Sequence, residues 1–227
     1  MYKLISIVMF MLMTSLSYAN DIYVTQSGAS LDLDITQDGS NNTVGNSTTA
    51  SASTGATTIL NIDQIGNSNV IKYQINGATY TGVINLVGNS NDVDLNCDST
   101  GGNSSCGSAN AVINFTGNSN DIDLDIGQTS SANTADVDIV GQSGSDSNVV
   151  AATVDGNSAI LTITINGDTN NYLIDIDGNG DVNGHTLIHS HTGGTADVDI
   201  VQSGINDQYI NLTTSGDNHD IDIQQTD

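Results

Sequence analysis

The feature that most constrains the fold is a glycine that recurs at steps of about 11 residues and closes a run of alternating apolar and polar residues. The glycines concerned are Gly28 and Gly39, then Gly66, Gly77 and Gly88, then Gly156, Gly167 and Gly178, with Gly117 and Gly204 closing similar runs. Glycine suits a tight corner because it adopts positive φ at little cost. Alternation with period two is typical of a strand with one face inside. Two such half-units therefore predict an all-β solenoid with a repeat of about 22 residues.

The half-unit recurs with a similar sequence along the chain. Examples are NIDQIGNSNVI (61–71), INLVGNSNDVDL (84–95), INFTGNSNDIDL (113–124) and VDIVQSGINDQYI (198–210). We expect about seven rungs of two strands each, in one repeat domain that spans residues 20–227. Segments rich in Ser, Thr, Gly and Asn interrupt the repeat near 45–57, 97–108, 127–135 and 179–195, and we expect them to form loops at rung corners.

Residues 1–19 have the organisation of a secretory signal peptide. Lys3 precedes a short apolar run, and the small residues Ser17 and Ala19 stand before the expected cleavage site. The run is too short for a spanning helix, and no later segment reaches the ~20 apolar residues that one needs. We therefore expect a secreted chain, outside the cell or on its surface, without membrane insertion.

The charge of the chain excludes several classes of partner. The sequence holds 26 acidic residues and two basic ones, and removal of the leader leaves Lys72 as the only Lys or Arg. Such a polyanion cannot neutralise phosphate groups, so neither nucleic acid nor an anionic membrane surface is an expected partner. We expect no cofactor, although divalent cations could bind non-specifically.

The aspartates of the repeat occupy alternate positions within the runs. In DVDLN (92–96), we expect Val93 and Leu95 to point inward and Asp92 and Asp94 to point into solvent. The same alternation recurs at 121–125, 136–139, 173–177, 197–200 and 220–223. We interpret these carboxylates as the solvated outer face of the rungs and not as a catalytic array.

One inward position, two residues before the turn glycine, takes either glutamine or a bulky apolar residue. It holds Gln26, Gln37, Gln64, Gln142 and Gln202 in some units, and Leu86, Phe115, Val154, Ile165 or Ile176 in others. A buried amide is tolerated only when it is hydrogen-bonded. Stacking like amides one rung apart meets this need, as in the amide ladders of cross-β structures.

Two cysteines enclose the short segment CDSTGGNSSC (97–106). In an exported protein this spacing favours a local disulfide between Cys97 and Cys106. A metal site would need further Cys or His ligands nearby, and the sequence offers none there.

The segment DIDGNGDVNG (175–184) places oxygen ligands at alternating positions, as a calcium loop does. The candidate ligands are Asp175, Asp177, Asn179 and Asp181. An EF-hand also needs a terminal glutamate and flanking helices, and both are missing. A solvated turn between rungs is the favoured interpretation, and calcium binding is the alternative.

The segment HTLIHSH (185–191) puts His189 and His191 on one face of a strand, with His185 nearby. Zinc or copper could bind such a pair, because imidazole suits both metals. No third ligand is evident, so we expect these histidines to be polar residues at the edge of an insertion.

No catalytic constellation is apparent. Polysaccharide lyases need a basic residue, and hydrolysis by paired carboxylates needs one carboxyl group with a raised pKa in a pocket. No Ser or Cys nucleophile has a recognisable base beside it. We expect the protein not to be an enzyme.

The segments QDGSNNTV (37–44) and QIGNSNVIKYQ (64–74) resemble curlin repeats, in which Gln, Gly, Asn and a second Gln recur at set spacing within each repeat. VTQSG (24–28) and IVQSGINDQYI (200–210) are weaker copies. The matching positions are Gln37, Asn42, Gln64, Asn69, Gln74 and Gln202. The resemblance implies a subunit of curli-type amyloid fibres in a biofilm matrix, with itself, a nucleator subunit and a secretion machinery as partners.

The ends of such a coil lack the protection that soluble β-proteins give to their edges. The sequence has no proline, a single lysine after the leader, and no helical segment that could act as a cap. The C-terminal NHDIDIQQTD (218–227) is itself strand-like. Head-to-tail stacking into an open fibre is therefore expected. The alternative is a monomeric solenoid adhesin that binds calcium or a surface and hides its terminal rungs.

Overall fold

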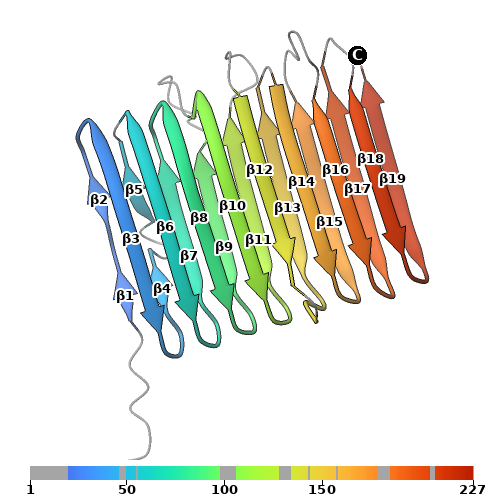
Figure 1. The fold of residues 1–227 in the computed structure, drawn as a ribbon, viewed down its shortest axis with the longest axis horizontal. Helices are drawn as coiled ribbons and strands as arrows, with labels where there is room; N and C mark the ends of the chain where they lie inside the picture. The colour runs from blue at the N-terminus through green and yellow to red at the C-terminus, as the bar shows by residue number, and fades with distance from the viewer. Residues whose placement is uncertain are drawn as a thin grey trace, which may run out of the picture.

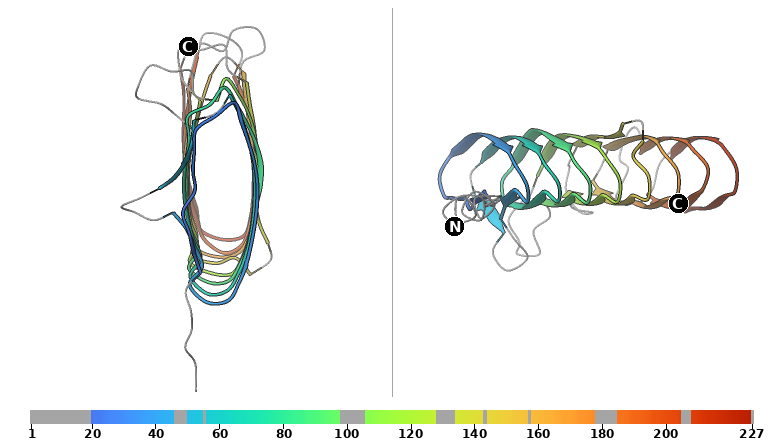
Figure 2. Two further views of the ribbon diagram at one scale, coloured as in Figure 1. Left: turned by 90° about the vertical axis from the view of Figure 1, so that its left-hand side faces the viewer. Right: turned by 90° about the horizontal axis from the view of Figure 1, so that it is seen from below.

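The computed structural model describes residues 20–45, 50–54, 56–97, 106–127, 134–142, 144–156, 158–177, 185–204 and 208–226. These residues form strands and turns, and none of them belongs to a helix that could cross a bilayer. The strands make two parallel sheets, here called sheet A and sheet B, which face each other across a flattened tube (Figures 1 and 2).

Sheet A contains, in spatial order, β1 (Asp21–Ile22), β4 (Thr43–Val44), β7 (Val70–Ile75), β9 (Asp92–Cys97), β11 (Asp121–Gly127), β13 (Val149–Asp155), β15 (Asn170–Asp177), β17 (Ala196–Ser203) and β19 (His219–Thr226). The short strand β2 (Thr25–Gln26) follows β1 and pairs with β5 (Ser51–Ser53), which also pairs with β7. Sheet B contains β3 (Ser30–Asp38), β6 (Thr57–Ile65), β8 (Thr79–Val87), β10 (Ser108–Thr116), β12 (Thr134–Gly141), β14 (Ser158–Asn166), β16 (Thr186–Thr192) and β18 (Tyr209–Ser215).

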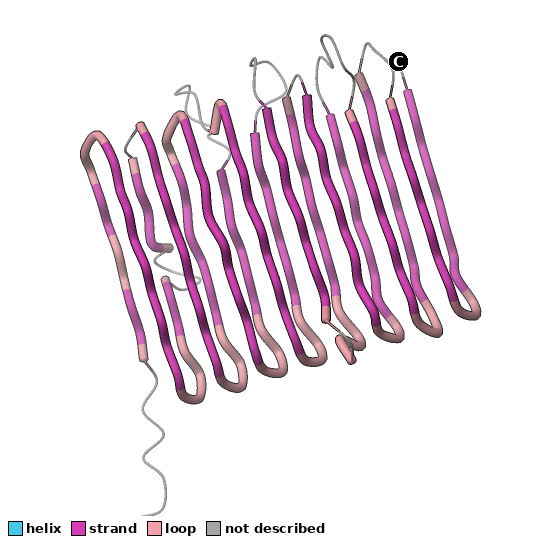
Figure 3. The backbone as a smooth tube through the Cα atoms, in the orientation of Figure 1, coloured by secondary structure: helices cyan, strands magenta, loops and turns pink. Residues whose placement is uncertain are grey.

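The chain alternates between the two sheets, so each strand pairs with the strand one turn earlier and one turn later. The path from β3 to β18 crosses seven such steps. Where no insertion intervenes, one turn carries the chain from Thr57 to its partner Thr79, which is the step that the recurring glycines predict. Figure 3 shows the strands stacked along one axis. The predicted β-solenoid of about seven turns is confirmed.

Alternate side chains of both sheets fill the tube. One column of sheet B runs Ile35, Ile62, Ile84, Ile113, Ile139 and Ile163, and each of these residues is buried. Burying a side chain of this size stabilises a fold by about 1.5–3 kcal/mol, and such columns line the tube for most of its length. The outward positions carry the polar residues, as alternation predicts.

Two of the expected insertions are shorter than predicted. Residues 186–192 form β16, which pairs in register with β14, so the loop expected over 179–195 does not extend through them. Residues 51–53 form β5 and rejoin sheet A inside the segment expected as a loop over 45–57. In both places the inward residues fit the column of the neighbouring rungs, and this fit outweighs their polar composition.

The turns that lead from sheet B to sheet A stack on one another, and five of them have the pattern Gly-x-x-Asn. Gly39, Gly66, Gly88, Gly117 and Gly167 belong to these turns, whereas Gly28, Gly156 and Gly204 lie at the opposite end of the strands, and Gly178 lies outside the described residues. A Cβ on Gly88 would lie 1.4 Å from the carbonyl oxygen of Gly66. Only glycine permits this spacing, because a side chain would separate consecutive rungs.

Candidate assembly interface

An unbroken ladder of asparagine side chains runs beside the stacked Gly-x-x-Asn turns. Its members are Asn20, Asn42, Asn69, Asn91, Asn120, Asn148 and Asn170. Each Nδ2 donates to the Oδ1 of the next asparagine, at distances from 2.7 Å for Asn91 to Asn120 to 3.4 Å for Asn20 to Asn42. All members except Asn20 are buried. The ladder satisfies amides that would otherwise be costly inside the fold.

Each ladder asparagine from Asn42 onward also holds its own turn. Asn120 Nδ2 donates to the carbonyl oxygen of Gly117 at 2.7 Å, and Asn91 Nδ2 donates to that of Gly88 at 2.8 Å. The residue before the asparagine has positive φ, as at Ser90 (59°) and Ser119 (58°). The side chain thus fixes a strained corner and links it to the next rung.

Sequence reasoning placed only Asn42 and Asn69 in this ladder. It missed Asn20, Asn91, Asn120, Asn148 and Asn170. The signal that could have found most of them was the spacing of three residues between a turn glycine and an asparagine, which the repeated GNSN segments contain.

Glutamines form two separate short rows near the ends of the coil. In sheet B, Gln64 Nε2 donates to Gln37 Oε1 at 2.7 Å, and Gln37 Nε2 donates to the carbonyl oxygen of Asn20. In sheet A, Gln225 Nε2 donates to Gln202 Oε1 at 2.9 Å. In sheet B, the column of Gln37 and Gln64 continues with the apolar residues Leu86 and Phe115. In sheet A, the apolar residues Val154 and Ile176 precede Gln202 and Gln225 in their column.

Gln26 starts the sheet A column whose far end holds Gln202 and Gln225. The column runs from Gln26 through Ser53, Ile75 and a series of apolar residues. Gln26 Nε2 donates to the carbonyl oxygen of Ser30 at 3.1 Å, while its Oε1 has no hydrogen-bond partner among the described residues.

Two glutamines expected in the ladder are exposed. Gln74 points out of sheet A, because the neighbouring Tyr73 and Ile75 take the inward positions of β7. Gln142 follows the end of β12, where Gly141 occupies the inward position opposite Phe115. A Cβ on Gly141 would lie 2.8 Å from Phe115 Cζ, so the aromatic ring fills the space of the missing side chain.

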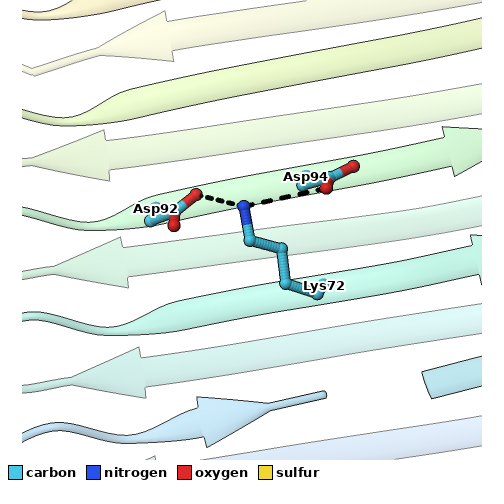
Figure 4. Close-up of polar contacts among 3 residues, drawn as sticks. All are labelled: Lys72, Asp92 and Asp94. Carbon is cyan, nitrogen blue, oxygen red and sulfur yellow. Dashed lines mark hydrogen bonds and ion pairs between the residues drawn. The ribbon is translucent and has the colours of Figure 1, made fainter. Parts of the chain in front are cut away.

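The aspartates of the strands lie on the outer faces, as predicted. Lys72 on β7 reaches across to β9, where its Nζ lies 2.6 Å from Asp92 Oδ1 and 3.7 Å from Asp94 Oδ2 (Figure 4). The next rung has no such cation, and the pKa of Asp123 is raised by partial burial and by the nearby Asp94 and Asp121 carboxylates. The outer face of sheet A therefore accumulates negative charge.

The histidines expected at an insertion edge lie inside the tube. His185, His189 and His191 are all buried, and the last two belong to β16, which His185 directly precedes. Tyr172 of β15 packs edge-on against His189 with ring centroids 4.4 Å apart, and its hydroxyl lies 2.8 Å from His191 Nδ1. Burial lowers the pKa of His189 to about 4, so this ring is neutral in the folded chain.

The remaining candidates form no cation site among the residues that the structure covers. Asp175 and Asp177 lie half-buried on the outer face of β15, and Asn179 and Asp181 lie outside the described residues. No three His, Cys, Asp or Glu side chains in the described segments are placed to share a metal ion. Cys97 and Cys106 are joined in a disulfide, with their Cα atoms 5.8 Å apart.

Among the residues that the structure describes, nothing covers either end of the coil. Val198 and Ile200 of β17 are 0% and 1% exposed, whereas Ile221 and Ile223, which follow them in the same columns of β19, are 37% and 47% exposed. At the other end Leu31 and Leu33 of β3 are only partly buried. Within the described segments, no element packs over β18 and β19 or over β1 and β3.

A comparison of the chain with family models, with curated proteins and with solved structures found no match.

Proposed function

We propose that this protein is the structural subunit of an extracellular amyloid-like fibre, in which copies stack end to end along the solenoid axis. The observation that carries the proposal is the contrast between Val198 and Ile200, which are buried, and Ile221 and Ile223, which occupy the same columns in an uncovered rung. A further rung would bury these side chains and pair the free backbone edge of β19. Each isoleucine would gain roughly 1 kcal/mol or more from the additional burial.

Edge protection is weak at both ends. Soluble β-proteins block sheet edges with proline, lysine, bulges or covering elements. The sequence contains no proline, and Lys72 lies in β7, away from both terminal rungs. Strand edges of this kind pair with strand edges of other chains, and a heterologous contact that does not close produces a filament.

Repulsion between stacked carboxylates opposes assembly. Two carboxylates one rung apart repel by roughly 1 kcal/mol in water before salt screening. The summed repulsion over several rows reduces the gain from burial, so acid, salt or divalent cations should promote fibre growth. The raised pKa of Asp123 agrees with this expectation for acid, because protonation relieves the repulsion from the neighbouring carboxylates.

The resemblance of QIGNSNVIKYQ (64–74) to curlin repeats supports the same role. We propose a secreted, non-enzymatic subunit that contributes to biofilm matrix and adhesion. A nucleator subunit and a secretion machinery would be its partners.

The test is assembly of the purified chain from residue 20 onward, followed by thioflavin fluorescence and electron microscopy. Ile221→Asp with Ile223→Asp should abolish fibres while the monomer stays folded, since both residues lie in the uncovered rung. The matched control, Gln224→Asp with Thr226→Asp, adds the same charges to the outer face of the same strand and should assemble. A wild-type chain that stays monomeric in acid and salt would instead favour the adhesin.

A further inference from the structure

Sheet A has one more level than sheet B, where a level is one step of the strand stack along the solenoid axis. Sheet A begins with β1 and β2 and ends with β19, whereas sheet B begins with β3 and ends with β18. Each strand of sheet B follows one level of sheet A and precedes the next (Figure 1). If β19 paired with β1 of another copy, sheet B would lack one strand between β18 and the next β3. That gap would leave buried backbone groups unpaired, which folded proteins avoid.

We propose that β19 of one copy takes the place of β1 and β2 in the next copy. This inference rests on the proposed fibre. In the exchanged junction β19 pairs with β4 and β5 of the next copy, β18 pairs with β3, and both sheets continue without a gap.

The inward side chains of β19 match the polarity of those that they replace, in the order polar, apolar, apolar, glutamine. The register of sheet A places His219 in the column of Asn20, Ile221 in that of Ile22, Ile223 in that of Val24 and Gln225 in that of Gln26. Between Gln26 and Gln202 that last column holds Ser53 and apolar residues, so glutamine returns only at its far end, in Gln202 and Gln225. β19 can therefore fill the vacated site with inward residues of the same kind.

The backbone of β1 and β2 is also replaceable. The carbonyl oxygens of Asn20, Ile22, Val24 and Gln26 accept hydrogen bonds from the N–H groups of Thr43, Gly45, Ala52 and Thr54, at 2.9, 2.8, 2.8 and 3.1 Å. The register carries these acceptor positions to His219, Ile221, Ile223 and Gln225 on the uncovered edge of β19. β19 is one strand of 8 residues, whereas β1 and β2 have 2 residues each. The longer strand offers the more continuous edge.

The outer-face charges favour exchange in sheet A. Without exchange, Asp220 would lie beside Asp21 of the next copy, and like charges directly opposite each other destabilise a sheet. With exchange, Asp220 lies beside Thr43 and Asp222 beside Gly45, so no carboxylate faces another.

The pairing of β18 with β3 is favourable as well. The outward residues of β18 are Tyr209, Asn211, Thr213 and Ser215, and those of β3 are Asp32, Asp34, Thr36 and Asp38. Asn211, on the preceding rung, would lie beside Asp34, an arrangement that occurs within the chain where Asn96 Nδ2 of β9 donates to Asp125 Oδ2 of β11 at 3.1 Å.

Cysteine cross-linking distinguishes the two junctions. Fibres grown from an equal mixture of Asp220→Cys and Thr43→Cys chains should give a covalent dimer on oxidation, because exchange makes these outward positions neighbours. Fibres from Asp220→Cys with Asp21→Cys should give none. The reverse pattern would overturn the exchange while leaving the fibre intact. A wild-type chain that forms no fibre would defeat the proposed function itself.

Deletion of residues 20–26 gives an independent readout. The deletion removes β1 and β2, the strands that must detach, so fibres should still form. The lag should be about tenfold shorter if around 10% of wild-type chains have these strands detached. Circular dichroism should first show that the shortened chain keeps its strand content. A folded deletion variant that no longer assembles beside a wild-type chain that does would contradict the exchange.

Discussion

Replacing Asn120 with alanine removes one link from the middle of the asparagine ladder. Asn120 Nδ2 donates to Gly117 O at 2.7 Å and to Asn148 Oδ1 at 2.8 Å. Its Oδ1 accepts from Asn91 Nδ2 at 2.7 Å and from the Asn91 backbone N–H at 3.2 Å. Alanine provides none of these bonds and leaves the Asn91 N–H without this acceptor inside the fold.

The expected loss is several hydrogen bonds of about 0.5–1.5 kcal/mol each, together with an unsatisfied buried group that costs about 1–3 kcal/mol. Asn120→Ala should therefore lower the free energy of unfolding by about 3–5 kcal/mol. Equilibrium unfolding in urea, followed by circular dichroism at low protein concentration, measures this difference.

Asn118→Ala is the matched control, since Asn118 lies two residues away in the same turn and is exposed. Its Oδ1 accepts one exposed backbone bond, from Asp146 N–H at 3.0 Å, so its loss should cost less than about 1 kcal/mol. If the two variants lost the same stability, the bonds of the buried ladder would contribute no more to the fold than one exposed bond.

Single residues allow three further predictions. His189, whose pKa is lowered to about 4 by burial, stabilises the fold fully above its ordinary pKa of 6.5 and less as the pH falls from 6.5 towards 4; His189→Leu should flatten this part of the acid unfolding curve. Lys72→Met should lower the free energy of unfolding by about 0.5–1 kcal/mol at low salt and by less at high salt, because Asp92 and Asp94 lose their cation; a salt-independent effect would argue against an electrostatic role. Gly88→Ala should destabilise the chain by about 3 kcal/mol or more in thermal unfolding, because the added Cβ would lie 1.4 Å from the Gly66 carbonyl oxygen. Gly144 also has positive φ, but an added Cβ there would meet nothing within 4 Å, so Gly144→Ala should cost only about 1–2 kcal/mol.

The repeat and the inward face of the strands could be predicted from the sequence, because two local rules decide them. Alternation assigns Val93 and Leu95 inward and Asp92 and Asp94 outward, and the recurring glycines set the length of a turn. Both rules act within one half-unit, so neither needs knowledge of which rungs are neighbours.

The members of each column were harder to predict, because insertions change the number of residues between one rung and the next. The register pairs Thr134 with Ser158, a longer step along the chain than the uninterrupted one from Thr57 to Thr79, and Gly141, not Gln142, stands opposite Phe115. His189 and His191 resemble loop residues in composition, yet their pairing with Ile163 and Ile165 puts them in the core. Such assignments depend on the alignment of whole rungs, which a single sequence leaves open wherever a loop is inserted.

In the proposed fibre each copy keeps its coil and adds a whole stack of rungs. Mass per unit length, measured by scanning transmission electron microscopy, tests this most directly. A chain of 23.4 kDa that adds the eight levels of sheet B, each about 4.8 Å high, gives about 6 kDa per nanometre. A fibre in which each chain lies flat in a single layer would give about 49 kDa per nanometre, and that value would rule out end-to-end stacking of intact coils.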